Sequence, residues 1–352
     1  MTEPTYSAVL VGLTGIGAGR LEEDSSIPVF GKMPRSHAAV YNHHPRIQLG
    51  GICDLRPEVL DQFKETWGDV WPDMRTYTDY REMFEVEEPD IVSVATSDHA
   101  HADITVAAAT GSARAIFCEK PIATSLADAD RMIAAADANG VLLSIDHTRR
   151  WDPLHLKARQ LVLSGELGPL RTIHAELFSP RAMLFRNGTH SIDLINFFAG
   201  TDPQWLTAEL EEGFEHFSEY QGDGGRDPDT DPYASAYIRF AGGIRAFYNS
   251  YKTAFPGSQV TLTCDRGRIE ISDRHALLIR GSSHYEWSTT PIQADSYTCE
   301  EQMAAMVELV DVLENGGELI SPGGEARKTL EIILGMLQSH HNGNARVNFP
   351  LG

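Results

Sequence analysis

The chain has 352 residues, which exceeds the length at which a single hydrophobic core usually stops growing, so we expect two domains. With 42% hydrophobic and 22% charged residues the composition is globular, and no apolar run reaches the roughly 18 residues that span a membrane. The formal net charge of −21 argues against nucleic acid and anionic membranes as partners, because both require clusters of Lys and Arg.

The chain leads almost directly into an apolar segment and shows no basic leader. We therefore expect neither a signal peptide nor a transit peptide, and a cytoplasmic location. The cysteines lie far apart, with no CxxC motif and no Cys/His ligand spacing, which argues against disulfides and against a metal site. We expect reduced, mostly packed thiols at Cys53, Cys118, Cys264 and Cys299.

The first part of the chain alternates short apolar runs with helical stretches. This alternation is typical of βαβ units and a parallel sheet, so we predict a doubly wound α/β Rossmann domain over residues 1–147. Ser125 is placed to cap one of the helices. The expected strands lie at 7–13, 47–54, 90–96, 114–120 and 141–146, and the expected helices include 57–67, 101–111 and 126–140.

After residue 147 the pattern changes to a helix followed by successive strands joined by Gly-containing turns. This predicts an α+β domain over residues 148–352, with a large, open, mostly antiparallel sheet. The expected strands lie at 170–178, 233–243, 244–253, 258–267 and 268–281, and the expected helices at 153–168, 300–316 and 324–343.

Two segments fit neither pattern. Residues 21–36 lengthen the first βα loop, and the sequence gives no indication of what they contact. The acidic, Gly-rich segment Gly213–Pro232 is longer than a typical connection, so we expect either a mobile lid or a surface loop.

A glycine-rich turn follows the first expected strand. It is similar to the dinucleotide-binding fingerprint, whose glycines allow a tight turn, close approach of the pyrophosphate and packing of the next helix. Gly12 and Gly17 fit the first and third glycines, whereas Thr14 takes the middle position and Gly15 stands beside it. With Ile16, these residues form the expected pyrophosphate site, although the cluster alone is also compatible with a plain turn.

Asp54 ends the second expected strand, where a carboxylate can accept hydrogen bonds from both ribose hydroxyls of NAD. Arg56 is close enough in sequence to meet the extra phosphate of NADP, but the carboxylate would repel that phosphate. We therefore expect NAD, with NADP left open. Asp54 is also placed to cap the next helix, a role that can coexist with ribose binding.

Glu119, Lys120 and Pro121 lie at the C-terminal end of the fourth expected strand, at the sheet edge where open α/β sheets bind their ligands. A lysine there can donate a hydrogen bond to a reacting oxygen and take part in acid/base chemistry. A lysine after a strand is more often a solvated surface residue, so the position alone does not establish this role.

Four segments together resemble one protein family. They are Glu119-Lys120-Pro121, the preceding ATSDHAHADITVAAATG, HTRRWDPLHLKARQLVLSGELGPL and NGTHSIDLINFFAG. They resemble the glucose-fructose oxidoreductase/inositol dehydrogenase (Gfo/Idh/MocA) family over nearly the whole chain. The resemblance implies an NAD(P)-dependent oxidoreductase with a sugar or polyol substrate in the cleft between two domains. It also implies that Lys120 is catalytic and that a homodimer or homotetramer is built through the second domain's sheet. We expect both Glu119 and Lys120 to contact the cofactor as well.

The segment NGTHSID departs from the family in one place. Members often carry an Asp four residues before a catalytic His; His190 matches the His, but Arg186 occupies the Asp position. We expect His190 to act as the acid/base without that Asp, because imidazole ionises near neutral pH. Arg186 is an expected substrate-binding residue. Asp193, one turn on, is expected either to bind substrate hydroxyls or to be an ordinary acid on the helix surface.

The remaining expectations concern two further loops. The family usually has Asn-x-x-His at the nicotinamide side after the third major strand. We therefore expect Thr96 and one of His99 and His101 to line the cofactor, the alternative being surface histidines. Of Arg149 and Arg150, we expect one to bind substrate and the other to form an interdomain ion pair.

The expected reaction is reversible. His190 or Lys120 takes the proton of a secondary hydroxyl while the hydrogen on its carbon leaves as hydride to the nicotinamide. Two other functions stay open. One is a glycoside-cleaving branch of the same family, with tightly held NAD and no net redox change. The other is a non-catalytic dinucleotide-binding sensor, which the departures at Thr14 and Arg186 bring into consideration.

Overall fold

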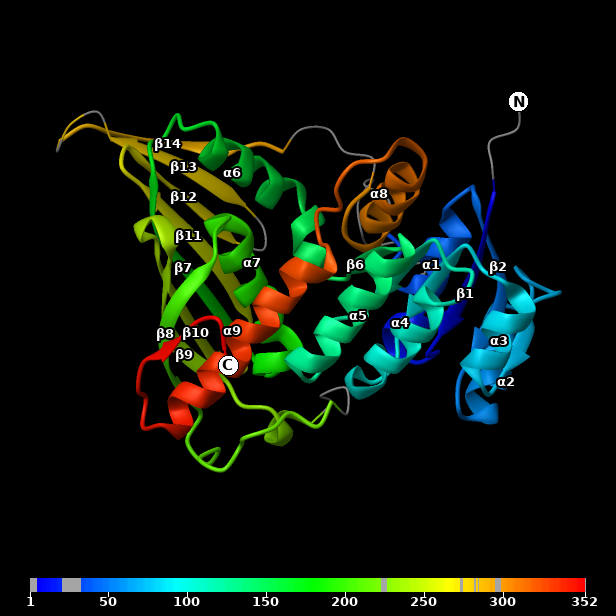
Figure 1. Cartoon of the computed structure of the whole chain (residues 1–352). Coiled ribbons are helices and arrows are strands. Elements are labelled where there is room, and N and C mark those ends of the chain that lie inside the picture. Colours follow the sequence, from blue (N-terminus) through cyan, green and yellow to red (C-terminus); the bar gives the residue numbers. More distant parts are fainter. Residues whose placement is uncertain are drawn as a thin grey trace. The chain divides into compact units, whose positions relative to one another are not determined.

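The first part of the chain folds into a parallel sheet with helices between its strands, as its alternating pattern predicts (Figure 1). The computed structural model describes residues 5–20, 33–222, 227–272, 275–281, 283, 285–294 and 299–351. Most of the 21–36 insertion, up to residue 32, and residues 223–226 of the acidic segment lie outside these ranges.

Within the described residues this sheet has six strands in the order β3-β2-β1-β4-β5-β6, and each neighbouring pair is parallel. The order reverses between β1 and β4, so the loops that follow these two strands meet at the carboxyl edge. The first helices and strands are β1 (Tyr6–Val11), η1 (Gly15–Gly17), α1 (His37–His43), β2 (Ile47–Cys53), α2 (Pro57–Trp67), β3 (Arg75–Tyr77) and α3 (Tyr80–Glu87). They are followed by β4 (Ile91–Val94), η2 (Asp98–Ala100), α4 (His101–Ala109), β5 (Ala115–Cys118), α5 (Leu126–Asn139) and β6 (Leu142–Ile145).

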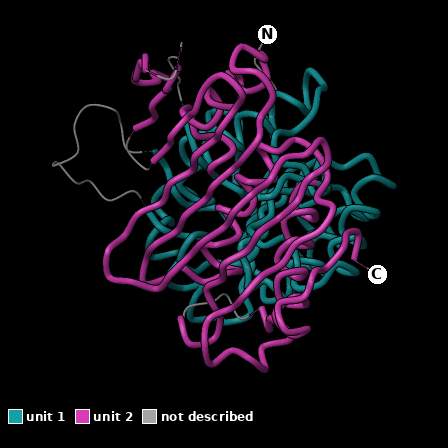
Figure 2. The backbone as a smooth tube through the Cα atoms, turned by 90° about the vertical axis from the view of Figure 1, so that its left-hand side faces the viewer, with its two compact units in different colours: residues 1–148, 299–324 teal, residues 149–298, 325–352 magenta. Residues whose placement is uncertain are grey.

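The chain divides into two compact units, coloured separately in Figure 2. Unit 1 comprises Met1–Thr148 and Cys299–Gly324, and unit 2 comprises Arg149–Thr298 and Glu325–Gly352. The first boundary lies one residue from the predicted one, but Cys299–Gly324, which we expected in the second domain, belongs to unit 1.

Packing and hydrogen bonds explain why this late segment belongs to unit 1. Its helix α8 (Glu301–Asn315) packs against α1, β5 and β6. Beyond the helix, the Ser321 hydroxyl donates a hydrogen bond to the carbonyl of Ile145 at 2.7 Å, and the Ile145 N–H donates to the Ser321 carbonyl at 2.9 Å. The periodicity of α8 gave no indication of which sheet it would cover.

Unit 2 contains the predicted large, mostly antiparallel sheet. In the part of the chain that the structure describes, it has nine strands in the order β14-β13-β12-β11-β7-β10-β9-β8-β15, and the β7–β10 pair is parallel. Helix α7 packs against β7 and β10, and α6 packs against β12 and β14.

The helices and strands of unit 2 begin with η3 (Thr148–Trp151), α6 (Pro153–Leu163), β7 (Leu170–Ser179), η4 (Leu184–Gly188), α7 (Thr189–Ala199) and β8 (Pro203–Leu210). The first of these, η3, crosses the boundary between the two units. They continue with η5 (Pro228–Thr230), β9 (Ala234–Phe240), η6 (Ala241–Gly243), β10 (Arg245–Lys252), β11 (Gly257–Cys264) and β12 (Gly267–Ser272). The last are β13 (Ala276–Gly281), β14 (Trp287–Ile292), α9 (Gly323–His341) and β15 (Val347–Asn348).

Two properties of the described residues concern membrane crossing and cysteine chemistry. Across the described ranges, no helix combines the length and the apolar character that crossing a bilayer demands. Cys53, Cys118 and Cys264 are free, buried thiols, which confirms the packing that we expected for them.

Candidate active site

The glycine turn after β1 has the geometry of a dinucleotide-binding turn. Gly12 has φ +90°, and a Cβ there would lie 2.4 Å from the carbonyl oxygen of Ala95. A Cβ on Gly17 would lie 2.2 Å from the carbonyl oxygen of Gly12. Both positions therefore require glycine, the first and third of the fingerprint. Thr14, Gly15 and Ile16 lie between them and are partly or fully exposed, so a ligand can reach their backbone.

Asp54 lies directly after β2 and connects the glycine turn to the next loop. One oxygen of its carboxylate accepts a hydrogen bond from Leu13 N at 3.2 Å, and the other accepts from Arg56 N at 3.1 Å. The Arg56 guanidinium pairs with the same carboxylate at 3.4 Å, yet its side chain is 56% exposed and that of Asp54 is 10% exposed. The carboxylate is thus held at the strand end where a ribose is bound in this fold.

Lys120 lies at the carboxyl end of β5 and is 7% exposed, so it is not a solvated surface lysine. Its neighbour Glu119 is equally buried, and Oε1 of Glu119 lies 3.4 Å from Nε2 of His37. The other ring nitrogen of His37 lies 2.9 Å from Oγ of Ser93, which also contacts the Tyr41 hydroxyl at 2.6 Å. The residue before the lysine is therefore fixed by groups from α1 and β4.

A second carboxyl completes this buried cluster. Asp146 follows β6 and is 1% exposed. Burial raises the pKa of Asp146 well above its ordinary value, and the charge of Glu119 raises it further. Burial also raises the pKa of Glu119, but the hydrogen bond with His37 and the charge of Lys120 outweigh this effect and bring it to about 2. These shifts favour the protonated form of Asp146 and the charged form of Glu119 beside Lys120.

His37, Glu119 and Asp146 also offer three ligand-type atoms within 4.8 Å of one another. A small cation could use that spacing. The charge of Lys120, however, already acts on both carboxyls and lowers the pKa of each. The positive charge that a metal would bring is therefore already supplied, and we keep the sequence prediction that the site uses no metal.

The loop after β4 carries Thr96, His99 and His101. Nδ1 of His101 lies 2.9 Å from the carbonyl oxygen of Pro121, and Nε2 lies 3.3 Å from that of Thr96. The fully buried His101 ring thus joins the loop after β4 to the loop of Lys120. Thr96 is half-buried at the strand end and His99 is exposed. These positions leave Thr96 the better placed of the three to meet a ligand.

His190 lies in the first turn of α7, in unit 2. Arg186 and Asn187 come from η4, the single π-helical turn that leads directly into α7. All three side chains are partly exposed, whereas the residues that follow along α7, from Ser191 to Phe198, are buried. The predicted acid/base residue is therefore at the accessible end of an otherwise buried helix.

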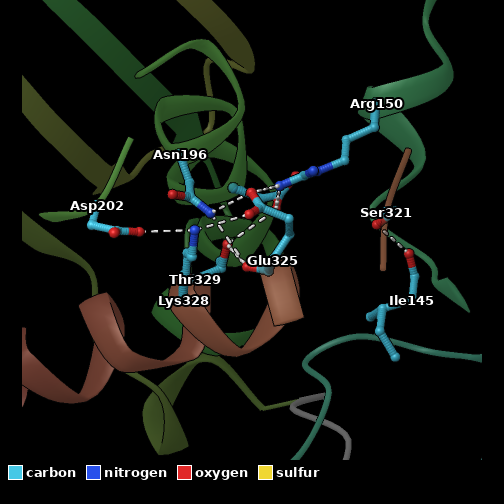
Figure 3. A network of polar contacts seen from close by, with 9 residues as sticks. Ile145, Arg150, Asn196, Asp202, Ser321, Glu325, Lys328 and Thr329 are labelled. Atoms are coloured by element: carbon cyan, nitrogen blue, oxygen red, sulfur yellow. Dashed lines mark hydrogen bonds and ion pairs between the residues drawn. The ribbon is translucent and has the colours of Figure 1, made fainter. Parts of the chain in front are cut away.

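Asp193 does not continue this accessible surface, as we had expected it to. It is 0% exposed and forms two hydrogen bonds of 2.8 Å with the guanidinium of Arg150, itself 2% exposed. Thr329 donates a third bond to Asp193 at 3.0 Å, and Glu325 lies 3.6 Å from Arg150 (Figure 3). Lys328 joins Glu325 to Asp202, again as Figure 3 shows.

This network changes the interpretation of the two arginines. The ion pairs of Arg150 with Asp193 and Glu325 lie within unit 2, so neither of them is the interdomain pair that we expected. Asp193 is bonded on both oxygens and fully buried, so it matches neither the expected substrate ligand nor the ordinary acid on the helix surface. Arg149 is half-buried and donates to the Ser191 hydroxyl at 3.3 Å. It remains the better substrate-binding candidate of the two.

Sequence reasoning missed His37, Asp146 and Gln302, all of them buried in unit 1. Asp146 ends a strand just as Asp54 does, so the same reasoning could have identified it. His37 follows the helix cap Ser36, a signal for a helix start but not for a catalytic neighbour. Gln302 lies on α8 about 180 residues from the lysine, and its hydrogen bond lowers the pKa of Asp146.

Two family models match the chain. The one described as "Oxidoreductase family, NAD-binding Rossmann fold" matches residues 29–147, and the one described as "GFO/IDH/MocA C-terminal domain" matches residues 155–270. Together they cover well over half of the chain.

Among curated proteins, the chain is 29% identical over 166 residues to the inositol 2-dehydrogenase of Salmonella paratyphi B, which covers 44% of this chain and 48% of that protein. It therefore spans about half the length of that relative. It is 24% identical over 331 residues to the D-apiose dehydrogenase of Paraburkholderia graminis, covering 86% of this chain and 84% of the other.

Solved structures share the fold. The structure of the WlbA dehydrogenase from Bordetella pertussis in complex with NADH and UDP-GlcNAcA superposes with a TM-score of 0.73 at 18% identity. The superposition covers 99% of this chain and 100% of the other. Such a low identity establishes the common fold only.

Proposed function

Because the chain belongs to the Gfo/Idh/MocA family of NAD-binding oxidoreductases, we propose that it is a nicotinamide-dependent dehydrogenase or reductase. Its substrate class is a sugar, a sugar derivative or an inositol that carries a secondary hydroxyl or keto carbon. The names of the relatives, an inositol 2-dehydrogenase and a D-apiose dehydrogenase, support this class.

The observation that carries the proposal is the burial of Lys120 beside an ionised Glu119 at the carboxyl end of β5. A buried ammonium needs a partner charge, and Glu119 is held in place for that purpose by His37. An ammonium fixed in this way donates a hydrogen bond to a developing alkoxide without first having to reorganise.

Each candidate residue is assigned a role in this chemistry. When bound, the nicotinamide accepts or supplies the hydride. Lys120 binds the reacting oxygen and stabilises the charge that develops on it. His190 takes the hydroxyl proton during oxidation and returns it during reduction, because its imidazole is the accessible titratable group of α7. Arg149 and Arg186 bind further hydroxyl or carboxylate groups of the substrate.

We propose NAD as the cofactor, held by the Gly12–Gly17 turn and by Asp54. The turn leaves no room for a Cβ at its first and third glycines, and the carboxylate at the end of β2 suits two free ribose hydroxyls. A 2′-phosphate would face that carboxylate, which disfavours NADP. Thr96 and Glu119 complete the set of expected contacts at the carboxyl edge.

We propose a homodimer or homotetramer assembled through the open face of the unit 2 sheet. A row of rings crosses that face from β8 to β7: Trp205 lies 5.2 Å from Tyr237, Tyr237 lies 5.2 Å from Phe247, and Phe247 stacks on His174 at 4.5 Å. These side chains are partly exposed, and a contiguous apolar strip of this kind is typical of an interface.

We also propose that the enzyme works in the cytoplasm. The buried thiols Cys53, Cys118 and Cys264 support this, because a reducing compartment keeps such groups out of disulfides.

The proposal is tested by following the absorbance of reduced nicotinamide with NAD and with NADP against inositols, aldoses, nucleotide sugars and aryl glycosides. We expect NADH to form with NAD and at least one polyol or sugar. Aglycone release with no build-up of NADH would favour the glycoside-cleaving branch. Tight NAD binding with no reaction across the panel would favour a sensor.

A further inference from the structure

The acidic segment Gly213–Pro232 ends in a carboxylate that is bonded to the turn before His190. Asp231 is 0% exposed. Its two oxygens lie 3.2 and 3.0 Å from the backbone nitrogen of Phe185, and one of them lies 3.2 Å from that of Arg186. The next residue continues the attachment, because Leu184 N donates to the carbonyl of Pro232 at 2.8 Å.

These bonds satisfy N–H groups that the turn itself leaves without partners. The first N–H groups of a helix have no carbonyl behind them, and they carry the positive end of the helix dipole. A carboxylate is the best acceptor for them, and here it comes from a segment some 45 residues away in sequence. The side chain of Met183, the residue before η4, does not cap the turn.

The turn so anchored leads directly into the helix that carries the proposed acid/base residue, His190. η4 ends at Gly188 and α7 begins at Thr189, with no break between them, so the direction of η4 sets the position of His190. Arg186, whose N–H is bonded to Asp231, occupies the position where the family resemblance leads us to expect an Asp. We propose that Asp231 is a positioning residue that fixes the turn immediately before the helix of His190. This inference rests on the proposed function of His190.

The groups around Asp231 determine the pKa of its carboxyl. Burial raises the pKa of its carboxyl to about 7, although the N–H groups of Phe185, Arg186 and Leu184 and the charge of Lys252 lower it. Lys252 and Tyr248 face it from β10, and Lys252 is itself paired with Glu211 and bonded to the carbonyl of Pro228. The carboxyl thus changes its charge near neutral pH.

The protonated form of Asp231 favours the stability of the fold, whereas the ionised form favours the anchoring of the turn. A folded-state pKa above the ordinary value of about 3.9 means that its contribution to stability is complete below pH 4 and is lost as the pH rises through 7. The ionised form accepts the N–H bonds most strongly, so the anchoring of the turn is strongest above pH 7. Activity and stability therefore respond to this residue in opposite directions.

The test compares Asp231→Asn with Asp229→Asn, which removes the same charge at an exposed position of the same segment. We expect Asp231→Asn to lower kcat by about 10- to 100-fold, the usual cost of a misplaced catalytic group. The Kd for NADH should stay within about twofold of that of the wild type, because unit 1 is unchanged. The control should match the wild type in both quantities.

A second readout does not depend on activity. Amide hydrogen exchange at residues 184–188 should become faster in Asp231→Asn and stay unchanged in Asp229→Asn. Faster exchange with an unchanged kcat would overturn the positioning role, and unchanged exchange would overturn the anchoring itself. If no substrate turns over, the exchange result still stands while the proposed function fails. Should Asp231→Asn not fold, Asp231→Glu keeps the charge, and unchanged kcat and exchange in that variant would contradict the proposal.

Discussion

Nε2 of His37 lies 3.4 Å from Oε1 of Glu119, the residue that precedes the proposed catalytic lysine. The contact joins the first residue of α1 to the end of β5, and Ser93 holds the opposite side of the same ring. The buried His37 ring is therefore bonded at both nitrogens. Through Glu119, it stabilises the negative charge beside Lys120.

The two buried carboxyls should respond to pH in opposite senses. The folded-state pKa of Asp146 is raised, so its contribution to stability is complete below about pH 4 and is lost as the pH rises through that folded-state value. The pKa of Glu119 is lowered to about 2, so its contribution is present above about pH 4 and is lost as the pH falls toward 2.

Asp146→Asn mimics the protonated acid and should therefore become more stable relative to the wild type as the pH rises. Glu119→Gln should cost about 1–3 kcal/mol near neutral pH, because it leaves buried donors without their charged acceptor. Urea unfolding from pH 4 to 9 measures both effects. Identical pH dependence in the two variants would contradict the assignment of the proton to Asp146.

Replacement of Gly17 by Ala should disrupt unit 1. The new Cβ would lie 2.2 Å from the carbonyl oxygen of Gly12, so the backbone must move, at a cost of about 3 kcal/mol or more. Gly15→Ala is the matched control in the same turn, because no atom lies within 4 Å of its Cβ and the positive φ costs only about 1 kcal/mol. Calorimetric melting compares the two; equal losses in Tm would mean that the turn is not packed as described.

Asp54→Asn should weaken the binding of NADH by about 10- to 100-fold, since a hydrogen bond to a charged group contributes about 1.5–3 kcal/mol. It should also narrow any preference for NADH over NADPH, because the charge that repels the 2′-phosphate is gone. Titration of nicotinamide fluorescence measures both affinities. Asp61→Asn, on the exposed side of α2, is the control. Tighter binding of NADPH than of NADH by the wild type would show that the proposed cofactor is wrong.

Asp193→Ala should destabilise unit 2 by about 3–5 kcal/mol, because it leaves the Arg150 guanidinium buried without its partner. Asp202→Ala removes an exposed partner of Lys328 from the same network and should cost less than about 1 kcal/mol. Urea unfolding distinguishes them. If Asp193→Ala is as stable as Asp202→Ala but loses affinity for substrate, the substrate-binding role that we first expected for Asp193 is restored.

Local signals predicted much of the fold. Short apolar runs gave β1, β2, β4, β5 and β6, and Ser125 caps α5 as expected, with Oγ accepting from Asp128 N at 3.2 Å. The prediction missed β3, β8 and β14. β3 has only three residues, and β8 and β14 are held in the sheet by pairing with β9 and β13 and not by a pattern of their own. A strand of a few residues has too little periodicity to stand out.

The residues of the candidate site also fall into those that local signals predicted and those that they did not. Lys120, Asp54 and the glycine turn follow strands directly, so chain order alone brings them to one edge of the sheet. His37, Asp146 and Gln302 reach the cluster through packing between distant segments, which no local pattern encodes. Asp193 illustrates the opposite error: its helical spacing from His190 suggested a shared surface, but Arg150, some 40 residues earlier, pairs with it in the interior.

The most direct test of the central claim is the rate of NADH formation by wild type, Lys120→Ala and Lys64→Ala with a substrate identified in the panel. Lys64 is exposed on α2, so its variant controls for the loss of a positive charge. We expect Lys120→Ala to lose about 100- to 10,000-fold in kcat, as is usual for a group that handles the reacting proton, and to keep its affinity for NADH. Turnover by Lys120→Ala equal to that of Lys64→Ala would contradict the account.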